Sequence, residues 1–253
     1  MIGFAALAFA GGLIAGSFIG VVADRVPRGE SIVGPRSRCP RCGAQIAAYD
    51  NVPVVSWLLL RGRCRHCGER ISARYPLTEL VLGVLFAVTF LVLGDDPAEL
   101  ALGLVFVSLL TAVTLTDLER RVIPNAIVLA GAVTGIAIVA FTDPESLPER
   151  GIAAAAAGGF LLLGALIFRG GMGMGDVKLA ALMGLYLGRA VAAALAVGFA
   201  AGALVGVALM LRHGASARKR ALPFGPFLAL GGLVGLWAGD EIVDWYLDAF
   251  FGD

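Results

Sequence analysis

Charged residues are scarce in this chain. Asp, Glu, Lys and Arg make up 15% of its 253 residues, against about 25% in a typical soluble domain. Apolar residues reach 58%, and the mean hydropathy is +0.87. So much apolar surface requires a solvent other than water, so we expect the chain to be embedded in a lipid bilayer. Outside one loop it also lacks basic patches interleaved with aromatic residues, which argues against nucleic-acid binding.

Basic residues are also absent from the N-terminal apolar run, which extends to the first charged residue, Asp24. A cleaved signal peptide would carry positive charge ahead of its apolar stretch and a small-residue cleavage site after it. Here Arg25 and Arg28 follow the run instead. We therefore expect a retained membrane span whose N-terminus lies outside the cell.

Apolar runs recur along the whole chain. A helix needs roughly 20 apolar residues to cross a hydrocarbon core about 30 Å thick. Seven runs meet or approach this length, whereas the run at 177–188 would rise only about 18 Å. This short helix crosses if its start lies below the headgroups in a protein-lined, watery cavity. The longer runs lie at 3–22, 76–94, 98–116, 122–141, 151–168, 190–211 and 222–247.

The positions of the basic residues support eight helices. Lys and Arg are concentrated in the cytoplasmic loops of membrane proteins. With the N-terminus outside, 18 of the 20 Lys and Arg residues fall inside, and only Arg150 and Arg189 fall outside. Without the short helix, the basic run 218–220 would lie outside. The sequence therefore predicts an all-α polytopic membrane protein of about eight transmembrane helices. Its inside segments are 23–75, 116–121, 169–178 and 212–221.

All four cysteines lie in the long polar segment 23–75. They form two Cys-x-x-Cys pairs, Cys39/Cys42 and Cys64/Cys67, and each pair is followed by a glycine, which lets a turn bring backbone N–H groups close to a thiolate. This pattern is typical of a tetrahedral structural zinc site. Two disulfides are the alternative, but a reducing cytosol disfavours them. A closed site of four cysteines leaves no open position for catalysis, so we expect zinc to fold the loop.

Two aspartates lie at membrane depth, where an ionisable group is costly and is a candidate for function. Asp117 ends the third predicted helix, and Asp176 begins the short sixth one. The predicted topology places both at cytoplasmic helix ends, at similar depth. Two carboxyl groups about 3 Å apart share one proton. One can then activate a water while the other polarises a peptide carbonyl, and the sequence leaves open which does which.

Each aspartate also has a structural interpretation. The segment 116–119 fits a capping box, and Asp176 could cap its helix with Lys178 as its ion-pair partner. Either residue alone would be weak support for catalysis. The two together, at one face of the membrane, favour an aspartate dyad.

Glycines 170, 171, 173 and 175 precede Asp176. A backbone without Cβ atoms can approach an extended substrate closely. We therefore assign Gly173, Gly175 and Lys178 to a substrate-facing loop. A phosphate-binding loop is the alternative, but the run lacks the Gly-Lys-Ser/Thr ending and no predicted strand precedes it.

These motifs together resemble the type IV prepilin leader peptidase/N-methyltransferases, a family of GxGD membrane aspartic proteases. The likeness covers nearly the whole chain, from GSFIGVVADRVPRG through PRSRCPRCG, RGRCRHCG and YPLTEL to TDLERRVIPN, GMGMGDVKL and PFGPFLALGG. It implies that Asp117 and Asp176 are the catalytic pair and that the four cysteines bind zinc.

The resemblance also implies two activities. Such enzymes remove a short basic leader from type IV prepilins, or from the pseudopilins of protein secretion, by cutting after a glycine at the cytoplasmic face of the inner membrane. They then methylate the new N-terminal residue with S-adenosylmethionine. The likeness ties this second step to the cysteine loop and to Gly62. We therefore expect a first transmembrane helix at 1–22, a cytoplasmic zinc-binding loop domain at 23–75 and a seven-helix peptidase domain at 76–253.

Two residues need separate comment. Asn125 stands where many family members have Asp, and because asparagine cannot share a proton we expect it to lie outside the dyad without loss of cleavage. Glu79 matches the family, and we favour an interfacial ion pair with Arg74 over a direct role.

Two rival functions are a proton-relaying transporter and a catalytically inactive scaffold for pilus assembly. The position of the acids near one face argues against the transporter, and the intact aspartate pair argues against the scaffold.

Overall fold

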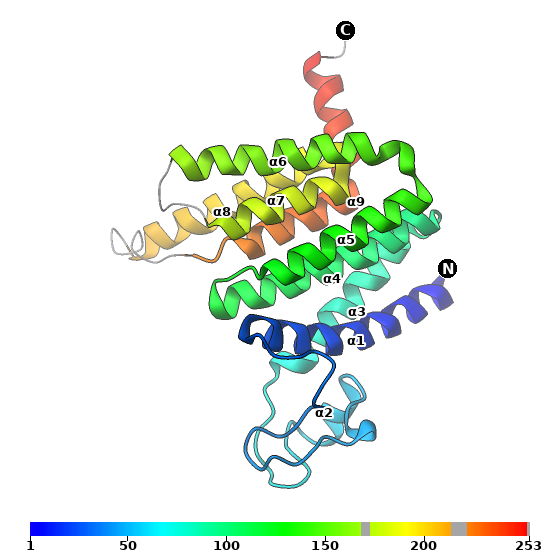
Figure 1. Cartoon of the computed structure of the whole chain (residues 1–253), viewed down its shortest axis with the longest axis vertical. Coiled ribbons are helices and arrows are strands. Elements are labelled where there is room, and N and C mark those ends of the chain that lie inside the picture. Colours follow the sequence, from blue (N-terminus) through cyan, green and yellow to red (C-terminus); the bar gives the residue numbers. More distant parts are fainter. Residues whose placement is uncertain (168–172, 214–221, 252–253) are drawn as a thin grey trace. The chain divides into compact units, whose positions relative to one another are not determined.

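The computed structural model describes residues 1–167, 173–213 and 222–251 (Figure 1). Within these ranges the chain is helical with no strand, which confirms the predicted all-α class. Gly170, Gly171 and the basic run 218–220 lie outside the described residues. The chain divides into two units, Met1–Asp95 and Asp96–Asp253. The three-part division expected from the sequence stays a prediction.

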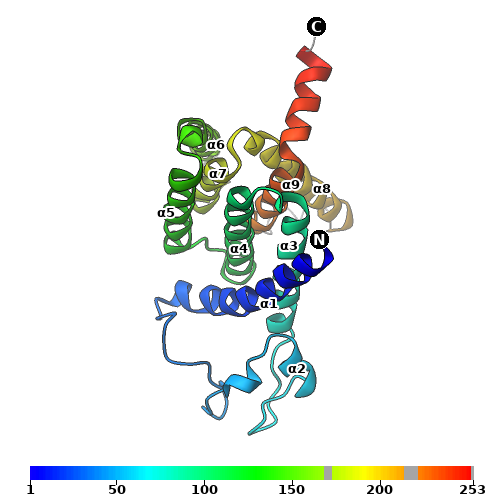
Figure 2. The ribbon, with the colours of Figure 1, turned by 90° about the vertical axis from the view of Figure 1, so that its right-hand side faces the viewer.

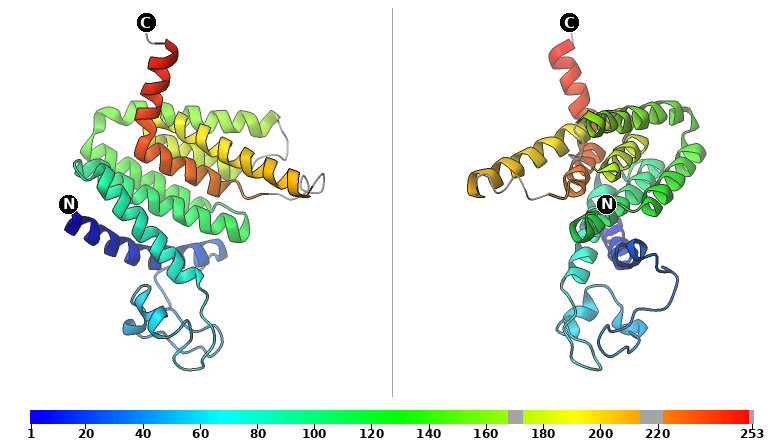
Figure 3. Two further views of the ribbon diagram at one scale, coloured as in Figure 1. Left: turned by 180° about the vertical axis from the view of Figure 1, so that it is seen from behind. Right: turned by 60° about the vertical axis from the view of Figure 1, so that its left-hand side comes forward.

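The first unit is built on two long helices, α1 (Ile2–Arg25) and α3 (Arg74–Leu93), which pack against each other (Figures 2 and 3). The buried face of α1 carries only small residues, spaced three or four apart, and small residues let membrane helices approach closely. They are Gly12, Gly16, Gly20 and Ala23. Between the two helices run the short elements η1 (Val26–Arg28), η2 (Ala48–Asp50) and α2 (Val55–Leu59).

The second unit is a bundle of longer helices. They are α4 (Pro97–Arg120), α5 (Asn125–Thr142), α6 (Leu147–Ile167), α7 (Met174–Leu187), α8 (Val191–His213) and α9 (Gly225–Phe251), with the turns η3 (Pro144–Ser146) and η4 (Gly188–Ala190). Figure 1 shows the chain turning back at η4, so that α7 and α8 are separate helices. Among the described residues, seven stretches are long and apolar enough to cross a membrane. One of them, Met174–His213, contains both α7 and α8. The predicted count of about eight helices is confirmed.

The core of the second unit is centred on Tyr186 of α7, which is 2% exposed. Its ring stacks on Phe106 of α4 with a centroid distance of 4.9 Å. Its hydroxyl donates a 2.8 Å hydrogen bond to the carbonyl oxygen of Gly131 in α5. One side chain therefore joins three helices, and it satisfies its polar atom within the bundle, where water is excluded.

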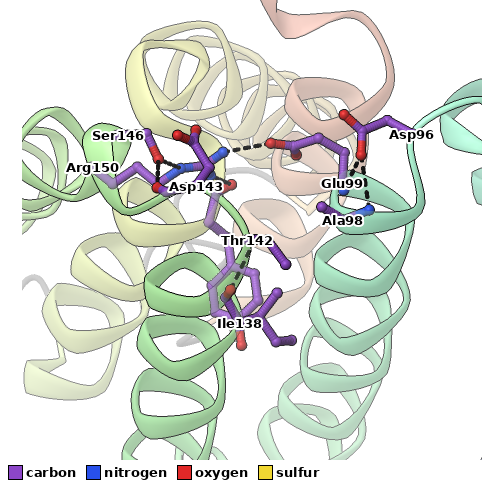
Figure 4. A network of polar contacts seen from close by, with 9 residues as sticks. Asp96, Ala98, Glu99, Ile138, Thr142, Asp143, Ser146 and Arg150 are labelled. Atoms are coloured by element: carbon purple, nitrogen blue, oxygen red, sulfur yellow. Dashed lines mark hydrogen bonds and ion pairs between the residues drawn. The ribbon is translucent and has the colours of Figure 1, made fainter.

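A polar network lies at the end of this unit where α4 begins (Figure 4). Asp96 caps α4 by accepting hydrogen bonds from the N–H groups of Ala98 and Glu99 at 2.8 and 3.2 Å, and an aspartate is favoured at this position. Arg150 at the start of α6 forms an ion pair with Glu99 at 2.7 Å and donates to the carbonyl oxygen of Tyr186 at 2.6 Å. The start of α4, the start of α6 and the end of α7 are thereby tied together.

Candidate active site and metal centre

Asp117 lies in the last turn of α4, with its side chain buried. Its Oδ2 atom accepts a 2.8 Å hydrogen bond from the backbone N–H of Gly225, the first residue of α9. A Cβ atom placed on Gly225 would lie only 2.8 Å from the same oxygen. The absence of a side chain at 225 is what lets the backbone reach this carboxylate. Because α4 continues to Arg120, the capping-box alternative for 116–119 is excluded.

Asp176 lies in the first turn of α7 and is half-buried. Its Oδ2 accepts a hydrogen bond from the N–H of Gly173 at 3.3 Å, and its own N–H donates to the carbonyl oxygen of Gly173 at 3.1 Å. The side chain therefore caps the helix, as its structural interpretation expected. Within the described residues, the second carboxylate oxygen accepts no hydrogen bond.

The two aspartates lie near each other although they come from α4 and α7. The charge of Asp117 is one of the influences on the Asp176 carboxyl group. Ile123, just after α4, lies against Gly175, where an added Cβ would be 3.0 Å from the isoleucine side chain. The end of α4 and the starts of α5, α7 and α9 gather at one end of the unit (Figure 1). A joint action of Asp117 and Asp176 on one substrate stays a prediction.

Lys178 points to a different partner from the one the sequence suggested. Its Nζ donates a 2.8 Å hydrogen bond to Oδ1 of Asn125, at the start of α5. This bond fixes the beginning of α7 against the beginning of α5, two residues after Asp176. The substrate-facing role assigned to Gly173, Gly175 and Lys178 stays a prediction.

The four cysteines of the first unit converge. Their sulfur atoms all lie within 4.8 Å of one another, and Cys39 Sγ is 3.7 Å from Cys67 Sγ. All four thiols are free. Zinc–sulfur bonds of about 2.3 Å give a tetrahedron with sulfur–sulfur edges of about 3.8 Å. The cluster thus has the size of a single four-coordinate metal site, and its sulfurs are not arranged as two separate disulfides.

Two matching turns present these sulfurs. In each turn, the backbone N–H of the first cysteine donates a hydrogen bond to the carbonyl oxygen of the residue five positions later. The carbonyl oxygen of the same cysteine accepts a hydrogen bond from the N–H of the glycine four positions later. The bonds are Cys39 N to Ala44 O at 2.9 Å, Gly43 N to Cys39 O at 3.0 Å, Cys64 N to Glu69 O at 2.8 Å and Gly68 N to Cys64 O at 3.0 Å. The N–H groups of Cys42 and Arg41 lower the pKa of the Cys39 thiol to about 6. A thiolate is the form that binds metal.

Ion pairs brace the cysteine loop. Arg41 of the first turn pairs with Glu69 of the second. Asp50 accepts two hydrogen bonds from the Arg65 guanidinium, at 2.8 and 2.5 Å. This bidentate contact holds the pKa of the Asp50 carboxyl below its usual value. Both pairs join segments far apart in the loop, which favours a fixed arrangement around the cluster.

Comparison with known proteins identifies the family. Residues 11–93 match the bacterial peptidase A24 N-terminal domain, and residues 104–211 match the type IV leader peptidase family. A prepilin leader peptidase/N-methyltransferase of Bacillus subtilis (strain 168) is 38% identical over 243 residues, which is 95% of this chain and 97% of the relative. The chain belongs to the type IV leader peptidase family.

Other members of this family show similar identity. A prepilin leader peptidase/N-methyltransferase of Myxococcus xanthus (strain DK1622) is 42% identical over 219 residues, covering 83% of this chain and 64% of the relative. One from Aeromonas hydrophila is 37% identical over 228 residues, covering 87% of this chain and 77% of the relative. No solved structure matches the chain.

Glu79 and Gly62 hold structural positions in the first unit of this leader peptidase family member. Glu79, 8% exposed, accepts a 2.7 Å hydrogen bond from the backbone N–H of Val54. Gly62 has a φ of +66°, and a Cβ there would lie 2.8 Å from the ring of Trp57. The indole N–H of Trp57 donates to the carbonyl oxygen of Ile71 at 3.1 Å. Gly62 therefore leaves space for an indole that is fixed on its other side.

Gly225 was not singled out among the site residues in the sequence. The signal for it is the motif PFGPF, which ends a polar segment immediately before the last apolar run. A glycine followed by a proline at a helix start leaves the preceding backbone N–H free to bind a side chain. In the structure that N–H binds Asp117.

Proposed function

We propose that this membrane protein removes the leader peptide from type IV prepilins or pseudopilins with Asp117 and Asp176, and then N-methylates the new N-terminus. The observation that carries the proposal is that Asp117, in the last turn of α4, and Asp176, in the first turn of α7, lie at one end of the second unit, near enough for the charge of Asp117 to act on the Asp176 carboxyl group. Membership of the leader peptidase family, and relatives named for both activities, support it.

The dyad performs the cleavage by sharing one proton. The ionised aspartate takes a proton from a water molecule, whose oxygen attacks the carbonyl carbon of the scissile peptide bond. The protonated aspartate donates a hydrogen bond to the carbonyl oxygen, where negative charge develops. The peptide nitrogen then leaves with a proton. The N–H of Gly225 fixes one oxygen of Asp117, so the other is oriented toward the water or the substrate.

The reaction takes place at the cytoplasmic face, with the N-terminus of the chain outside and the cysteine loop inside. The charge pattern supports this orientation, because 18 of the 20 Lys and Arg residues lie in the segments assigned to the inside. The end of the second unit that carries both aspartates is the one assigned to the cytoplasm. A basic leader in the cytoplasm would reach these two acids directly.

Zinc is the metal that fits the cysteine cluster best, since four thiolates in a tetrahedron are its usual structural ligands. Cys39, Cys42, Cys64 and Cys67 would hold it. All four coordination positions are then taken by the protein, so the metal supplies structural order. The residues around it position the loop for the methylation step, with S-adenosylmethionine as the methyl donor.

Substitution of each aspartate tests the cleavage. Asp117→Asn and Asp176→Asn should each slow the cleavage of a prepilin in membranes by at least about a thousandfold. When catalytic residues act as a unit, the loss of one removes most of the rate enhancement that they provide together. Asp143→Asn, an exposed acid at the opposite end of the second unit, is the matched control. Wild-type cleavage by either of the first two variants would remove that residue from the mechanism.

Methylation is tested separately with a labelled methyl donor and a cleaved pilin. Label should appear on the N-terminal residue of the pilin, detected by mass spectrometry of the N-terminal peptide. A product that is cleaved but carries no methyl group would reduce the proposal to a peptidase.

A further inference from the structure

The short helix α2, in the loop that joins α1 to α3 (Figure 2), turns its apolar side chains outward. Its buried side chain is polar, that of Ser56 at 6% exposure, whereas Leu58 and Leu59 are 61% and 79% exposed. Ser56 is held inward because its hydroxyl donates a 3.0 Å hydrogen bond to the carbonyl oxygen of Tyr49 and accepts one from the N–H of Val52 at 3.1 Å. The outward face of α2 is therefore aliphatic, and water disfavours such a face.

A pocket of about 530 Å³ adjoins this helix. Three of the residues that line it are arginines, and of the described residues in its wall none is acidic. Ser72 and Ala73, also in the wall, immediately precede α3, which is long and apolar enough to span a membrane. The pocket therefore lies where the chain enters the bilayer, near the depth of the lipid headgroups. Its arginines are Arg61, Arg63 and Arg70.

The two cysteine turns differ at one position in a way that adds positive charge here. In the first turn, the residue before the first cysteine and the residue three after the second form an antiparallel bridge between Arg38 and Gln45. In the second turn the same two positions are Arg63 and Arg70. Like charges directly opposite each other destabilise a pair of strands. An anion bound between the two guanidinium groups of the second turn would offset this repulsion.

The acidic residues of the loop do not neutralise the pocket. Segment 23–75 holds ten arginines and four acids. Three of these acids are paired with other arginines: Asp24 with Arg28, Asp50 with Arg65 and Glu69 with Arg41. Glu69 also acts on the neighbouring Arg70, so its charge is divided between two cations. The fourth acid, Glu30, is exposed and lies outside the pocket wall. Even with the two negative charges of a zinc ion bound by four thiolates, the loop stays positive.

We propose that this surface of the cysteine loop docks on the bilayer and binds anionic phospholipids. Leu58 and Leu59 insert among the acyl chains, and the three pocket arginines bind the lipid phosphates. Apolar insertion and basic charge are two signals that together hold a segment on a membrane surface. Because α3 continues from the pocket into the bilayer, the surface is already tethered beside the headgroups, which raises its effective concentration there. Docking fixes the loop against the lipid surface along which a membrane-anchored substrate arrives.

Photochemical cross-linking identifies what covers α2. The photoreactive residue benzoylphenylalanine replaces Leu59 in the zinc-loaded, full-length protein, in nanodiscs of phosphatidylglycerol and phosphatidylcholine. Lipid adducts at position 59, located by mass spectrometry, are the expected result. The same residue in place of Gln45, which is exposed in the first turn, is the matched control and should give few or none. Adducts of position 59 with a prepilin in the same nanodisc, or with a second copy of the chain, in place of lipid would overturn the proposal.

Trypsin, which cuts after arginine, tests the charge. Exchange of phosphatidylcholine for phosphatidylglycerol should slow the cut after Arg61 about fivefold or more, the effect of one basic residue held near an anionic surface. The cut after Arg38, in the first turn, should keep its rate and corrects for attraction of trypsin to the lipid. Arg70→Gln, which makes the second turn match the first, should reduce the protection of Arg61 to less than about twofold. Arg36→Gln, exposed and outside the pocket wall, should leave it unchanged.

Inorganic phosphate, added to phosphatidylcholine nanodiscs, distinguishes a lipid site from a site for free phosphate. Protection by inorganic phosphate alone, or equal protection in the two lipids, would overturn docking on anionic lipid. Zinc content and melting temperature identify a variant that has not folded. Arg70→Lys, which keeps the positive charge, should retain most of the protection, and its loss in a folded Arg70→Lys protein would contradict a role for charge.

Discussion

Gly225 donates its backbone N–H to Oδ2 of Asp117 across a sequence separation of 108 residues. The orientation of a buried carboxylate at the end of α4 therefore depends on the first residue of α9. Backbone donors are fixed by their helix, so this contact restricts the carboxylate more firmly than a mobile side chain would.

Substitution of Gly225 by Ala should reduce the rate of prepilin cleavage about tenfold or more. The added Cβ would lie 2.8 Å from the carboxylate oxygen, so Asp117 or α9 must shift, and small displacements of catalytic groups are costly. Initial rates on a prepilin in vesicles measure the effect. Gly206→Ala in α8, where a Cβ meets open space, is the control. Equal rates for the two variants would show that the Gly225 contact has no catalytic role.

The bond from Lys178 to Asn125 should influence cleavage more weakly. Lys178→Met removes the donor that fixes the start of α7, and we expect roughly a fivefold lower kcat, in keeping with the loss of one hydrogen bond to a charged group. Asn125→Asp keeps an acceptor oxygen at the same place and should retain most of the rate. If Asn125→Asp were as impaired as Lys178→Met, the bond would not explain the loss.

The two arginines assigned to the outside should differ in their contribution to stability. Arg150, whose side chain is 12% exposed, binds Glu99, Ser146 and the Tyr186 carbonyl, so Arg150→Gln should lower the unfolding free energy by about 2 kcal/mol. Arg189 pairs with Asp240 and Asp244 at the surface, and Arg189→Gln should cost less than about 1 kcal/mol. Thermal unfolding in one detergent compares them. The reverse order would contradict the burial-based ranking.

Removal of the metal should affect the first unit selectively. Chelation takes away the ligand that closes the cysteine cluster, and small metal sites couple binding to folding. We expect segment 26–73 to become sensitive to added protease and methylation to be lost, while cleavage falls far less because both aspartates belong to the second unit. Mass spectrometry of the proteolytic fragments locates the cuts. Full methylation by the metal-free protein would refute a structural role for zinc.

The helices were predictable because the length of an apolar run is a local property of the sequence. The apolar run at 98–116 corresponds to α4 (Pro97–Arg120), and the short run at 177–188 corresponds to α7 (Met174–Leu187). The nearness of Asp117 and Asp176 followed from counting spans. It required no knowledge of side-chain packing, because the direction of each helix places its end at one face or the other.

The contacts of the site residues were harder to predict. The ion pair suggested between Asp176 and Lys178 fails because residues two apart on a helix do not face each other, and the lysine binds Asn125 instead. The partners of Asp117 and Glu79 include backbone N–H groups of Gly225 and Val54. Every residue except proline has such a group, so nothing in the side-chain pattern marks these two.

The shortness of α7 has a consequence for how water reaches Asp176. Its 14 residues rise about 21 Å, less than the roughly 30 Å of a typical hydrocarbon layer. Most of the helix is buried among its neighbours, so protein and not lipid surrounds it. When its far end is level with one side of the layer, its first turn, which carries Asp176, begins below the other side. A water molecule that reacts at Asp176 must then enter through the protein.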